Sequence, residues 1–390
     1  MAINNVIGRP VSGEDFFNRV AELGRIWSRI QHNNILLLAP RRVGKTSLLR
    51  RLESDGGHGF EAVYVSVAGF GSEIEFISRL YEAVASRARG AQAVRSALGR
   101  VWARLPRLGK LEVPVVFKAE FLAPAAQDWR VLGEELLGVL RATEQRWLFL
   151  VDELPLFVME LLRESRTRAR SFLTWFRECR TDQKVDDSAR WLLSGSIGLD
   201  TLAVRERFTD TINDLASEVL GPFSADDADR FLAALAESHE IQLSPEVRTR
   251  ILVKVGWLIP YHLQLLFSTL VDRKLTTPRV LDVDEGYQRL LDPAHKNSFD
   301  WWQQRLVDEL GQPDAAHALA VLAAVARGDG GASRGVVSEL LASRGVPDDE
   351  HRRFLLDALE SDGYLVVNDG EYGFRSPLLR DYWRARVLSS

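Results

Sequence analysis

The sequence predicts an α/β protein whose core is a parallel β-sheet with helices on both faces. Three short apolar runs carry this prediction, because each is typical of a buried strand that ends in small or charged residues: Ile35–Leu38, Trp147–Val151 and Trp191–Ser194. A fourth run, Ala62–Val67, and helical patterns between the runs complete the alternation of strands and helices that forms a parallel sheet.

The composition narrows the class of protein. The 390 residues suffice for two or three domains, and 46% hydrophobic and 27% charged residues are ordinary for a globular protein. A net charge of −4 gives no general attraction to nucleic acid or anionic lipid. The single cysteine, Cys179, excludes an intramolecular disulfide and indicates a reducing compartment. Without a signal peptide or a run of about 18 apolar residues, we expect a cytoplasmic protein with no membrane contact.

The first run begins the strongest motif. Strand Ile35–Leu38 leads into a loop from Ala39 to Gly44, and an amphipathic helix pattern follows. The N–H groups of such a loop and the positive helix end form a cradle for phosphate oxygens. In this pattern Lys45 reaches the terminal phosphates and Thr46 binds magnesium. Ala39 replaces the first glycine, which requires a negative φ there. The predicted cradle residues are Pro40, Arg41, Arg42, Val43, Gly44, Lys45, Thr46 and Ser47.

The other two runs end in candidate catalytic side chains. Trp147–Val151 is followed by Asp152 and Glu153, and strand ends face the crevice where α/β sheets bind ligands. Asp152 would hold magnesium through water, and Glu153 would polarise an attacking water. After the third run, Ser194 or Ser196 could hydrogen-bond a γ-phosphate or that water, and an ordinary Ser-Gly turn explains the pattern equally well.

Several arginines follow these strands. Arg205 and Arg207 could reach a γ-phosphate across a subunit interface, an interaction that can change the rate by about 10³–10⁵. A surface position on a helix explains them at least as well. A solvated helix face is the favoured interpretation of a second group, Arg163, Arg166, Arg168 and Arg170.

The remaining segments predict how the core is extended. Residues 1–34 are an approach segment with a helix over Phe16–Ile30. An insertion occupies about 85–130, and its seven basic residues within 83–111 favour a solvated helix face over a contact for nucleic acid or an acidic partner.

Residues 222–280 are helical, with Ser224 as N-cap. A break between Gly256 and Pro260 predicts a helix start at Pro260 close to the nucleotide. Residues 281–312 form a helical connector.

The C-terminal residues predict three helices and a hairpin, the order of a winged helix: His317–Ala326, Ser333–Ser343 and Asp348–Ser361, then strands Tyr364–Asn368 and Glu371–Arg375. The turn between the strands, Asp369-Gly370, is a strong hairpin signal. From residue 317 onward nine basic and eleven acidic residues give a net charge of −2. DNA recognition needs a basic footprint, so protein contact is favoured over DNA binding.

Together these motifs resemble the archaeal-type, STAND-related branch of the AAA+ ATPases. The segments that carry the resemblance are residues 39–49, 151–155, 194–198, 221–224, 256–261, 362–366 and 374–383. The resemblance implies ATP with Mg²⁺, metal contacts at Thr46 and Asp152, Glu153 as catalytic carboxylate and Ser194 as sensor. It also implies a P-loop NTPase core over 1–221, a helical lid and connector over 222–312, and a winged-helix domain over 313–390.

The predicted function is ATP binding and Mg²⁺-dependent hydrolysis to ADP and phosphate, coupled to movement of the lid and winged helix and to a protein partner. The alternatives are a nucleotide-gated switch, or a DNA-binding regulator of the initiator or transposition type, with little turnover. A nucleotide-dependent homo-oligomer stays open. The predicted catalytic residues are Lys45, Glu153, Ser194, Arg205 and Arg207, and Pro260 joins the predicted nucleotide-binding residues.

Overall fold

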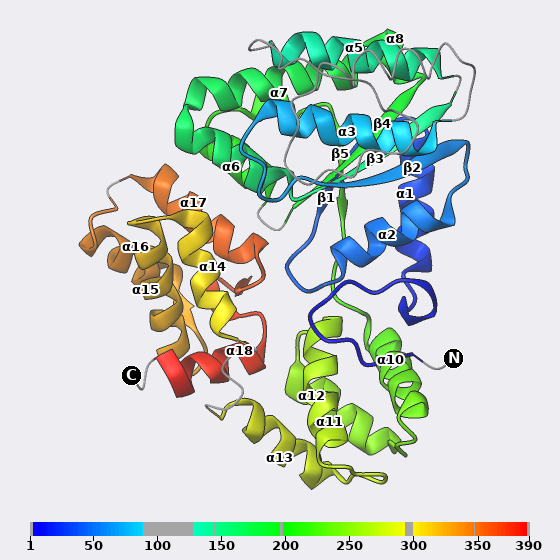
Figure 1. The fold of residues 1–390 in the computed structure, drawn as a ribbon. Coiled ribbons are helices and arrows are strands. Elements are labelled where there is room, and N and C mark those ends of the chain that lie inside the picture. Colours follow the sequence, from blue (N-terminus) through cyan, green and yellow to red (C-terminus); the bar gives the residue numbers. More distant parts are fainter. Residues whose placement is uncertain are drawn as a thin grey trace.

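The computed structural model describes residues 3–88, 128–143, 145–195, 198–292, 299–346 and 348–387. Figure 1 shows an α/β core, a group of helices below it and a C-terminal group beside both. Most of the insertion predicted over 85–130 and the candidate Ser196 lie outside the described residues.

The core is a parallel sheet in the order β2-β3-β4-β1-β5, which confirms the predicted α/β fold class. Its strands are β1 (Asn34–Leu38), β2 (Phe60–Ser66), β3 (Arg146–Asp152), β4 (Ala189–Ser194) and β5 (Leu215–Val219). The first four match the predicted apolar runs. The fifth was not predicted, because it is an edge strand in which only Glu218 is buried. That carboxylate forms an ion pair with Arg25, with 2.8 Å between Nε and Oε1.

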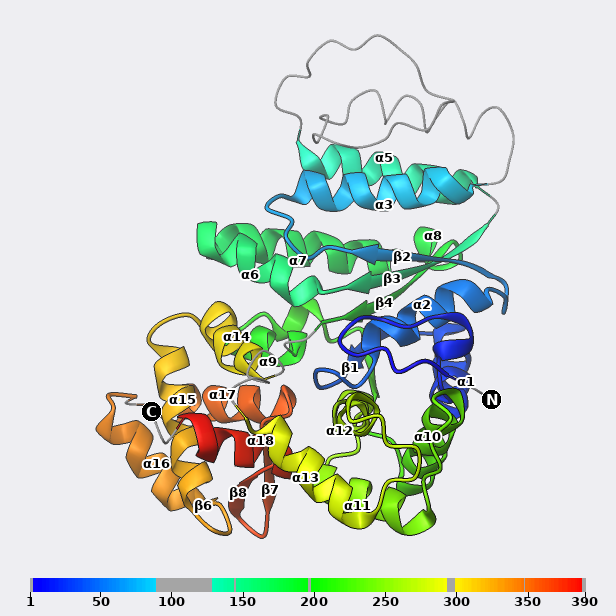
Figure 2. The same ribbon diagram turned by 60° about the horizontal axis from the view of Figure 1, so that its bottom comes forward.

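Helices cover both faces of the sheet, as Figures 1 and 2 show. Strand β3 illustrates the division. Phe149 and Val151 pack with α3, α5, α6 and α7, whereas Leu148 and Leu150 pack with α1 and α2. Burial on both faces explains why this strand is a continuous apolar run. The helices of the core are α1 (Val20–Ile30), α2 (Lys45–Asp55), α3 (Glu73–Arg87), α5 (Trp129–Ala142), α6 (Leu154–Glu164), α7 (Arg166–Thr181), α8 (Gln183–Asp186) and α9 (Leu199–Arg205).

The N-terminal segment differs in part from the predicted helix over Phe16–Ile30. A short 3₁₀ turn, Gly13–Asp15, comes first, and α1 begins only at Val20. Asn18 and Arg19 lie between them with φ of 57° and 71°. These left-handed conformations cannot continue a right-handed helix.

The segment predicted as a lid, called the lid below, contains α10 (Ala225–Ser238), α11 (Pro245–Val255), α12 (Pro260–Asp272) and α13 (Val280–Leu290). Ser224 is the N-cap of α10, as predicted, because its Oγ accepts a hydrogen bond from the Asp227 N–H at 3.0 Å. The predicted break is present too: α11 ends at Gly256 with φ +64°, and α12 begins at Pro260.

The C-terminal unit, residues 314–387, has the predicted order of three helices and a hairpin. It follows the connector helix α14 (Asp300–Leu310) and contains α15 (Asp314–Arg327), α16 (Arg334–Ser343), α17 (Asp349–Ser361), β7 (Leu365–Asn368) and β8 (Glu371–Phe374). Asp369 and Gly370 both have positive φ, as a tight hairpin turn requires. Three elements were not predicted: the two-residue strand β6 (Ala332–Ser333), α18 (Pro377–Tyr382) and a final helical turn, Trp383–Val387.

The C-terminal unit lies beside the lid in Figures 1 and 2 and is joined to it by specific contacts. The Tyr287 hydroxyl donates to Asp381 at 2.8 Å, and the buried His262 ring lies 3.3 Å from Ser376 Oγ. Gly256 packs so closely on Pro377 that an added Cβ would lie 2.6 Å from the proline ring. His262 is therefore part of a packed interface between the lid and this unit.

Helix α17, the third helix of the predicted winged helix, also packs against the core. The Arg205 guanidinium at the end of α9 lies 4.9 Å from the ring centroid of Phe354. One side of α17 is therefore occupied within the chain.

Candidate functional site

The loop between β1 and α2 has the backbone of a phosphate cradle. Gly44, the N-cap of α2, has φ +103°, and Arg42 has φ +62°. Ala39 does not have a positive φ, so an alanine fits where the common motif has glycine. Helix α2 begins at Lys45, and its N–H groups point back toward this loop. The strand, loop and helix predicted from residues 35–49 are confirmed.

Lys45 lies inside the cradle. Its Nζ donates to the Ala39 carbonyl at 3.0 Å, and its side chain is almost fully enclosed. Burial lowers the pKa of Lys45, and the neighbouring charges of Glu153, Asp152 and Asp362 oppose this shift. The net direction is downward, so the effect of burial on the Lys45 pKa exceeds that of the three carboxylates.

Asp152 is the centre of a convergent set of hydroxyl groups. It is 2% exposed, and its Oδ2 accepts from Thr46 Oγ1 at 2.8 Å and from the Tyr64 hydroxyl at 3.0 Å. Its Oδ1 accepts from Ser194 Oγ at 3.2 Å and from the Glu153 N–H at 3.1 Å. These donors hold the carboxylate in one orientation. Tyr64 was not identified from the sequence, because a tyrosine in a strand gives no catalytic signal.

The same atoms fit a magnesium ion. Mg²⁺ prefers oxygen ligands and takes only one or two from the protein when phosphates supply the rest. Thr46 Oγ1, in the first turn of α2, and Oδ2 of the buried Asp152 lie 2.8 Å apart. Among the described residues no group of three or more His, Cys, Asp or Glu could hold a metal alone, so a metal here would need the ligand's oxygens.

Glu153 follows Asp152 in a left-handed conformation with φ +62° and is the N-cap of α6. A non-glycine residue pays about 1–3 kcal/mol for such a conformation, and such residues cluster at functional sites. Its side chain lines the cavity beside Thr46 and Lys45. Ser194, at the end of β4, is buried against Asp152 and not against the cavity wall.

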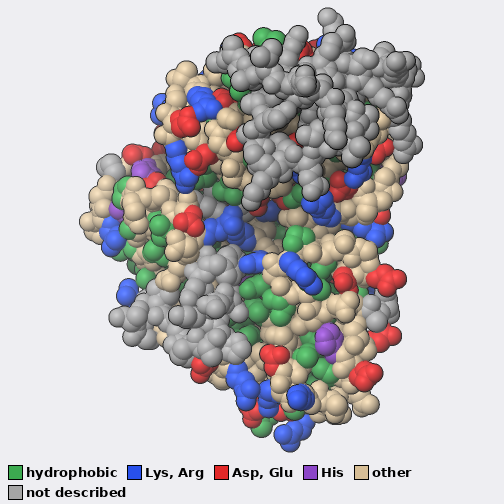
Figure 3. Space-filling view, in the orientation of Figure 1, with side chains coloured by type: hydrophobic (Ala, Val, Ile, Leu, Met, Phe, Trp, Pro, Cys, Tyr) green, Lys and Arg blue, Asp and Glu red, His purple; other side chains and the backbone are tan. Residues whose placement is uncertain are grey.

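The cradle opens into a cavity of about 940 Å³ between the core and the lid. All the predicted nucleotide-binding residues line it, from Pro40 to Ser47 and Pro260. Figure 3 shows basic side chains around a hollow between these two parts, with apolar side chains on the lid side. The sequence did not identify the ring side chains that also line the cavity, which are Phe16, Phe17, Phe70, Phe223, Phe231 and Tyr261.

The N-terminal segment closes the cavity by reaching both the cradle and the lid. The Val11 N–H donates to Ser47 Oγ at 3.0 Å, and Arg42 Nη1 donates to the Gly8 carbonyl at 2.9 Å. On the lid, Gln264 Nε2 donates to the Val6 carbonyl at 3.1 Å. These contacts join parts of the chain far apart in sequence, which is why pattern reasoning did not find them.

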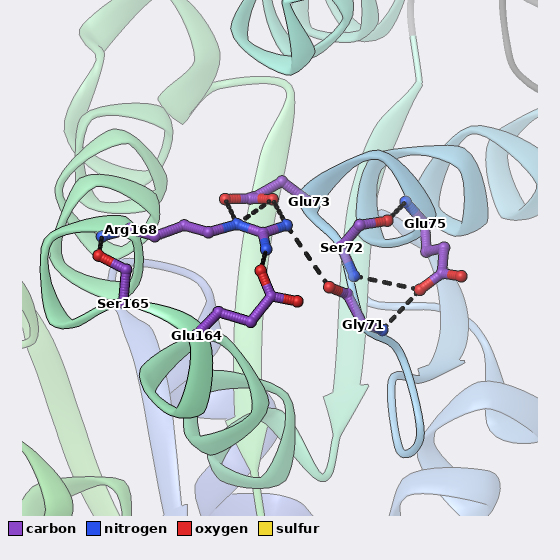
Figure 4. A network of polar contacts seen from close by, with 7 residues as sticks. All are labelled: Gly71, Ser72, Glu73, Glu75, Glu164, Ser165 and Arg168. Carbon is purple, nitrogen blue, oxygen red and sulfur yellow. Dashed lines mark hydrogen bonds and ion pairs between the residues drawn. The ribbon is translucent and has the colours of Figure 1, made fainter.

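The loop after β2, residues 67–72, forms another part of the wall through Gly69, Phe70 and Gly71. Figure 4 shows how it is held: Arg168 on α7 donates from Nε to Glu73 at 2.9 Å and also pairs with Glu164. Glu73 is buried. The predicted solvated role of Arg168 is therefore wrong, because the side chain pairs with a buried carboxylate.

Arg205 and Arg207 are placed away from the cradle. Arg205 pairs with Glu206 at 2.8 Å and packs on Phe354, while Arg207 is 78% exposed and lies 3.5 Å from Glu350. Neither is among the described residues that line the cavity. Within one chain they contact α17, and a role toward a neighbouring subunit stays a prediction.

Comparisons with known proteins establish the fold. No protein-family model matches the sequence, and no curated protein matches it. A Walker-type ATPase of Pyrococcus abyssi superposes with a TM-score of 0.63 at 16% identity, covering 97% of this chain and 99% of that one. The ORC2 protein of Aeropyrum pernix, in its ADPNP–ADP complexes, gives 0.55 at 12% identity, covering 97% and 98%. The chain thus has the fold of an AAA+ P-loop NTPase. No helix in the described ranges has the length and apolarity to cross a membrane.

Proposed function

We propose that this chain binds ATP with Mg²⁺ and hydrolyses it to ADP and phosphate. The observation that carries the proposal is the meeting of Thr46, Tyr64 and Ser194 on the Asp152 carboxylate, beside Lys45 and the cradle. Three strands and the first turn of α2 bring these side chains together, and the end of an ordinary strand has no need of such a convergence. The fold shared with the two solved structures agrees with this chemistry.

Each residue has a distinct task in this proposal. The loop N–H groups and Lys45 hold the phosphates, and Thr46 with Asp152 would hold the ion. Bound Mg²⁺ would neutralise charge on the transferred phosphoryl group. Glu153 orients a water and accepts its proton as the phosphoryl group departs. Ser194 acts as a positioning residue through Asp152, and Arg205 and Arg207 act only if a neighbouring subunit brings them to the cavity.

Nucleotide binding would also affect the position of the lid. Pro260, Tyr261 and Gln264 line the same cavity as the cradle, and α14 reaches it through Arg305. A bound nucleotide would therefore contact the core, the lid and α14 at the same time, and a rotation of the lid would change these contacts. A switch with little turnover is the second candidate, because the C-terminal unit packs on both core and lid.

For the C-terminal unit we infer a protein partner and not DNA. Its net charge is unfavourable for phosphate contacts, and α17 already packs on α9 in this arrangement. Assignment to the STAND-related branch, and a cytoplasmic location, rest on the sequence motifs and the single cysteine alone.

Calorimetry of the full chain tests the proposed binding directly. We expect Mg·ATP to bind with saturable heat and to raise the melting temperature, and Mg·GTP to bind more weakly. If neither nucleotide gives heat or thermal protection, the proposed function is wrong. If Mg·ATP and Mg·GTP bind equally, the proposed nucleotide site stands, but its preference for ATP is rejected.

Tyr64→Phe tests the metal assignment. The substitution removes one donor to Asp152 and keeps the ring on which the Arg50 guanidinium stacks at 3.7 Å. Loss of such a supporting hydrogen bond typically weakens metal binding by about tenfold or more. We expect a higher Mg²⁺ concentration for half-maximal nucleotide binding, and unchanged nucleotide affinity in EDTA. An unchanged Mg²⁺ requirement would reject the role of Tyr64, and Tyr372→Phe serves as the control.

A further inference from the structure

One face of α14 lines the nucleotide cavity, although this helix belongs to neither the core nor the lid. Gln304, Arg305 and Asp308 are among the lining residues. Because Asp308 follows the other two by four and three residues, the three side chains share one face of the helix. Trp302 and Leu306 are buried on another face. The buried face fixes the helix, and Arg305 extends from a different face into the cavity.

Arg163 ties α14 to α6, the helix that begins directly after Glu153. Its Nη2 donates to the Asp308 carbonyl at 3.2 Å, and Figures 1 and 2 both show α14 below α6. Arg163 itself also lines the cavity. Arg305 lies three residues before Asp308, which is about 4.5 Å along the axis of α14. Arg305 therefore enters the cavity from the side of α6 and of Glu153, the residue proposed as the base.

Two other arginines of the cavity hold parts of the chain together. Arg42 donates to the Gly8 carbonyl at 2.9 Å, and its guanidinium lies 4.6 Å from the ring centroid of Tyr261. Arg19 pairs with Glu22 at 2.8 Å. These contacts involve the cradle, the N-terminal segment and the lid, so both arginines have a structural task. Arg305 differs from them because it comes from a separate helix, on the side of the proposed base.

Hydrolysis of a triphosphate calls for positive charge beside the γ-phosphate. The water oxygen forms a bond to the γ-phosphorus, the bond from this phosphorus to the bridging oxygen of ADP breaks, and Glu153 accepts the water proton. The transferred phosphoryl group carries its charge on three oxygens in the transition state. A guanidinium presents its N–H groups in a rigid fork that matches two phosphate oxygens at once. Lys45 approaches from the cradle, so an arginine from the side of α6 would contact other oxygens of the same group.

We propose that Arg305 is a catalytic residue that contacts the γ-phosphate within its own chain, so that hydrolysis needs no arginine from a neighbouring subunit. The inference rests on the proposed hydrolysis and names the source of its catalytic arginine. Arg205 and Arg207, which the sequence predicted for this role, contact α17 and lie away from the cavity in this chain. Arg305 was not identified from the sequence, because it follows none of the strand motifs.

Arg305→Ala in the full chain tests this proposal by single-turnover phosphate release and by calorimetry with Mg·ATP. An arginine at the γ-phosphate is worth about 10³–10⁵ in rate, so we expect release to fall by about 10³-fold or more. Mg·ATP affinity should stay close to that of the parent chain, because the contact strengthens in the transition state. Arg305→Lys keeps the charge without the fork and should give an intermediate rate. Arg289→Ala removes an exposed arginine of α13 and, as the control, should hydrolyse at the parent rate.

Mixing two inactive variants separates action within one chain from action between chains. Lys45→Ala is expected to lose nucleotide binding but retains Arg305, whereas Arg305→Ala retains nucleotide binding and lacks the arginine. If the arginine acts within its own chain, the equimolar mixture stays inactive, and phosphate release by the parent chain is proportional to protein concentration. Recovery of activity in the mixture would show that Arg305 acts on a neighbouring subunit, and it would overturn the inference.

The remaining outcomes distinguish this inference from the proposed function. If the parent chain hydrolyses ATP and Arg305→Ala does so at the same rate, the role of Arg305 is rejected and the proposed hydrolysis stands. An equal loss of rate in Arg289→Ala would also reject that role. If Arg305→Ala does not fold, Arg305→Lys decides, because a parent-like rate without the fork overturns the inference. If the parent chain binds ATP without any turnover, the proposed hydrolysis fails, and the inference with it.

Discussion

Lys45→Ala is expected to abolish measurable nucleotide binding by the full chain. Lys45 supplies the positive charge at the end of the cradle, where its Nζ donates to the Ala39 carbonyl at 3.0 Å. Removing it deletes the attraction for the terminal phosphates and leaves the carboxylates of Asp152 and Glu153 to repel them. A loss of about 100-fold or more follows from a buried charge pair left without its partner.

Calorimetry with Mg·ATP and Mg·ADP measures this loss. Lys254→Ala is the matched control, since it removes the same charge from the lid, where Lys254 pairs with Asp284 at 3.1 Å. We expect the control to bind as the parent chain does. Parent-like affinity in Lys45→Ala would contradict the assignment of the cradle.

Glu153→Gln should separate hydrolysis from binding. The amide keeps the size of the side chain but cannot accept a proton from the attacking water. General-base catalysis is typically worth about 10²–10⁴ in rate, so we expect phosphate release to fall by that order while Mg·ATP binds with parent-like affinity. Single-turnover phosphate release and calorimetry on the same protein measure the two effects.

Glu160→Gln is the control for this variant. Glu160 lies on the same helix, α6, also lines the cavity and pairs with Arg163. It should hydrolyse ATP at the parent rate. Equal losses in both variants would indicate a general change in cavity charge and would reject Glu153 as the base.

The same pair of variants decides between an ATPase and a switch. If nucleotide-dependent protection of the C-terminal unit from proteolysis survives in Glu153→Gln and is lost in Lys45→Ala, binding alone drives the change. If both variants lose it, the change needs hydrolysis. A parent chain that binds ATP without any turnover also favours the switch.

The sequence predicted the elements that leave a pattern in their own residues, and it missed those that depend on contacts with residues far away in the chain. Strand β3 was predictable because burial on both faces requires an unbroken apolar run. Strand β5 was not, because an edge strand with one buried residue, Glu218, has no such run. The N-terminal helix was predicted too long, since the apolar spacing of residues 16–30 runs across Asn18 and Arg19, whose left-handed backbone delays the start of α1 to Val20.

The sequence by itself determined the strand, loop and helix of residues 35–49, the Asp152–Glu153 pair at the end of a strand and the first four strands of the sheet, because each depends on neighbours within a few residues. Only the tertiary structure decided that Tyr64 and Ser194 share Asp152, and that the N-terminal segment joins the cradle to the lid. These contacts depend on strand order and on the docking of separate units. Both are set by how apolar faces pack together, and local sequence patterns do not specify that packing.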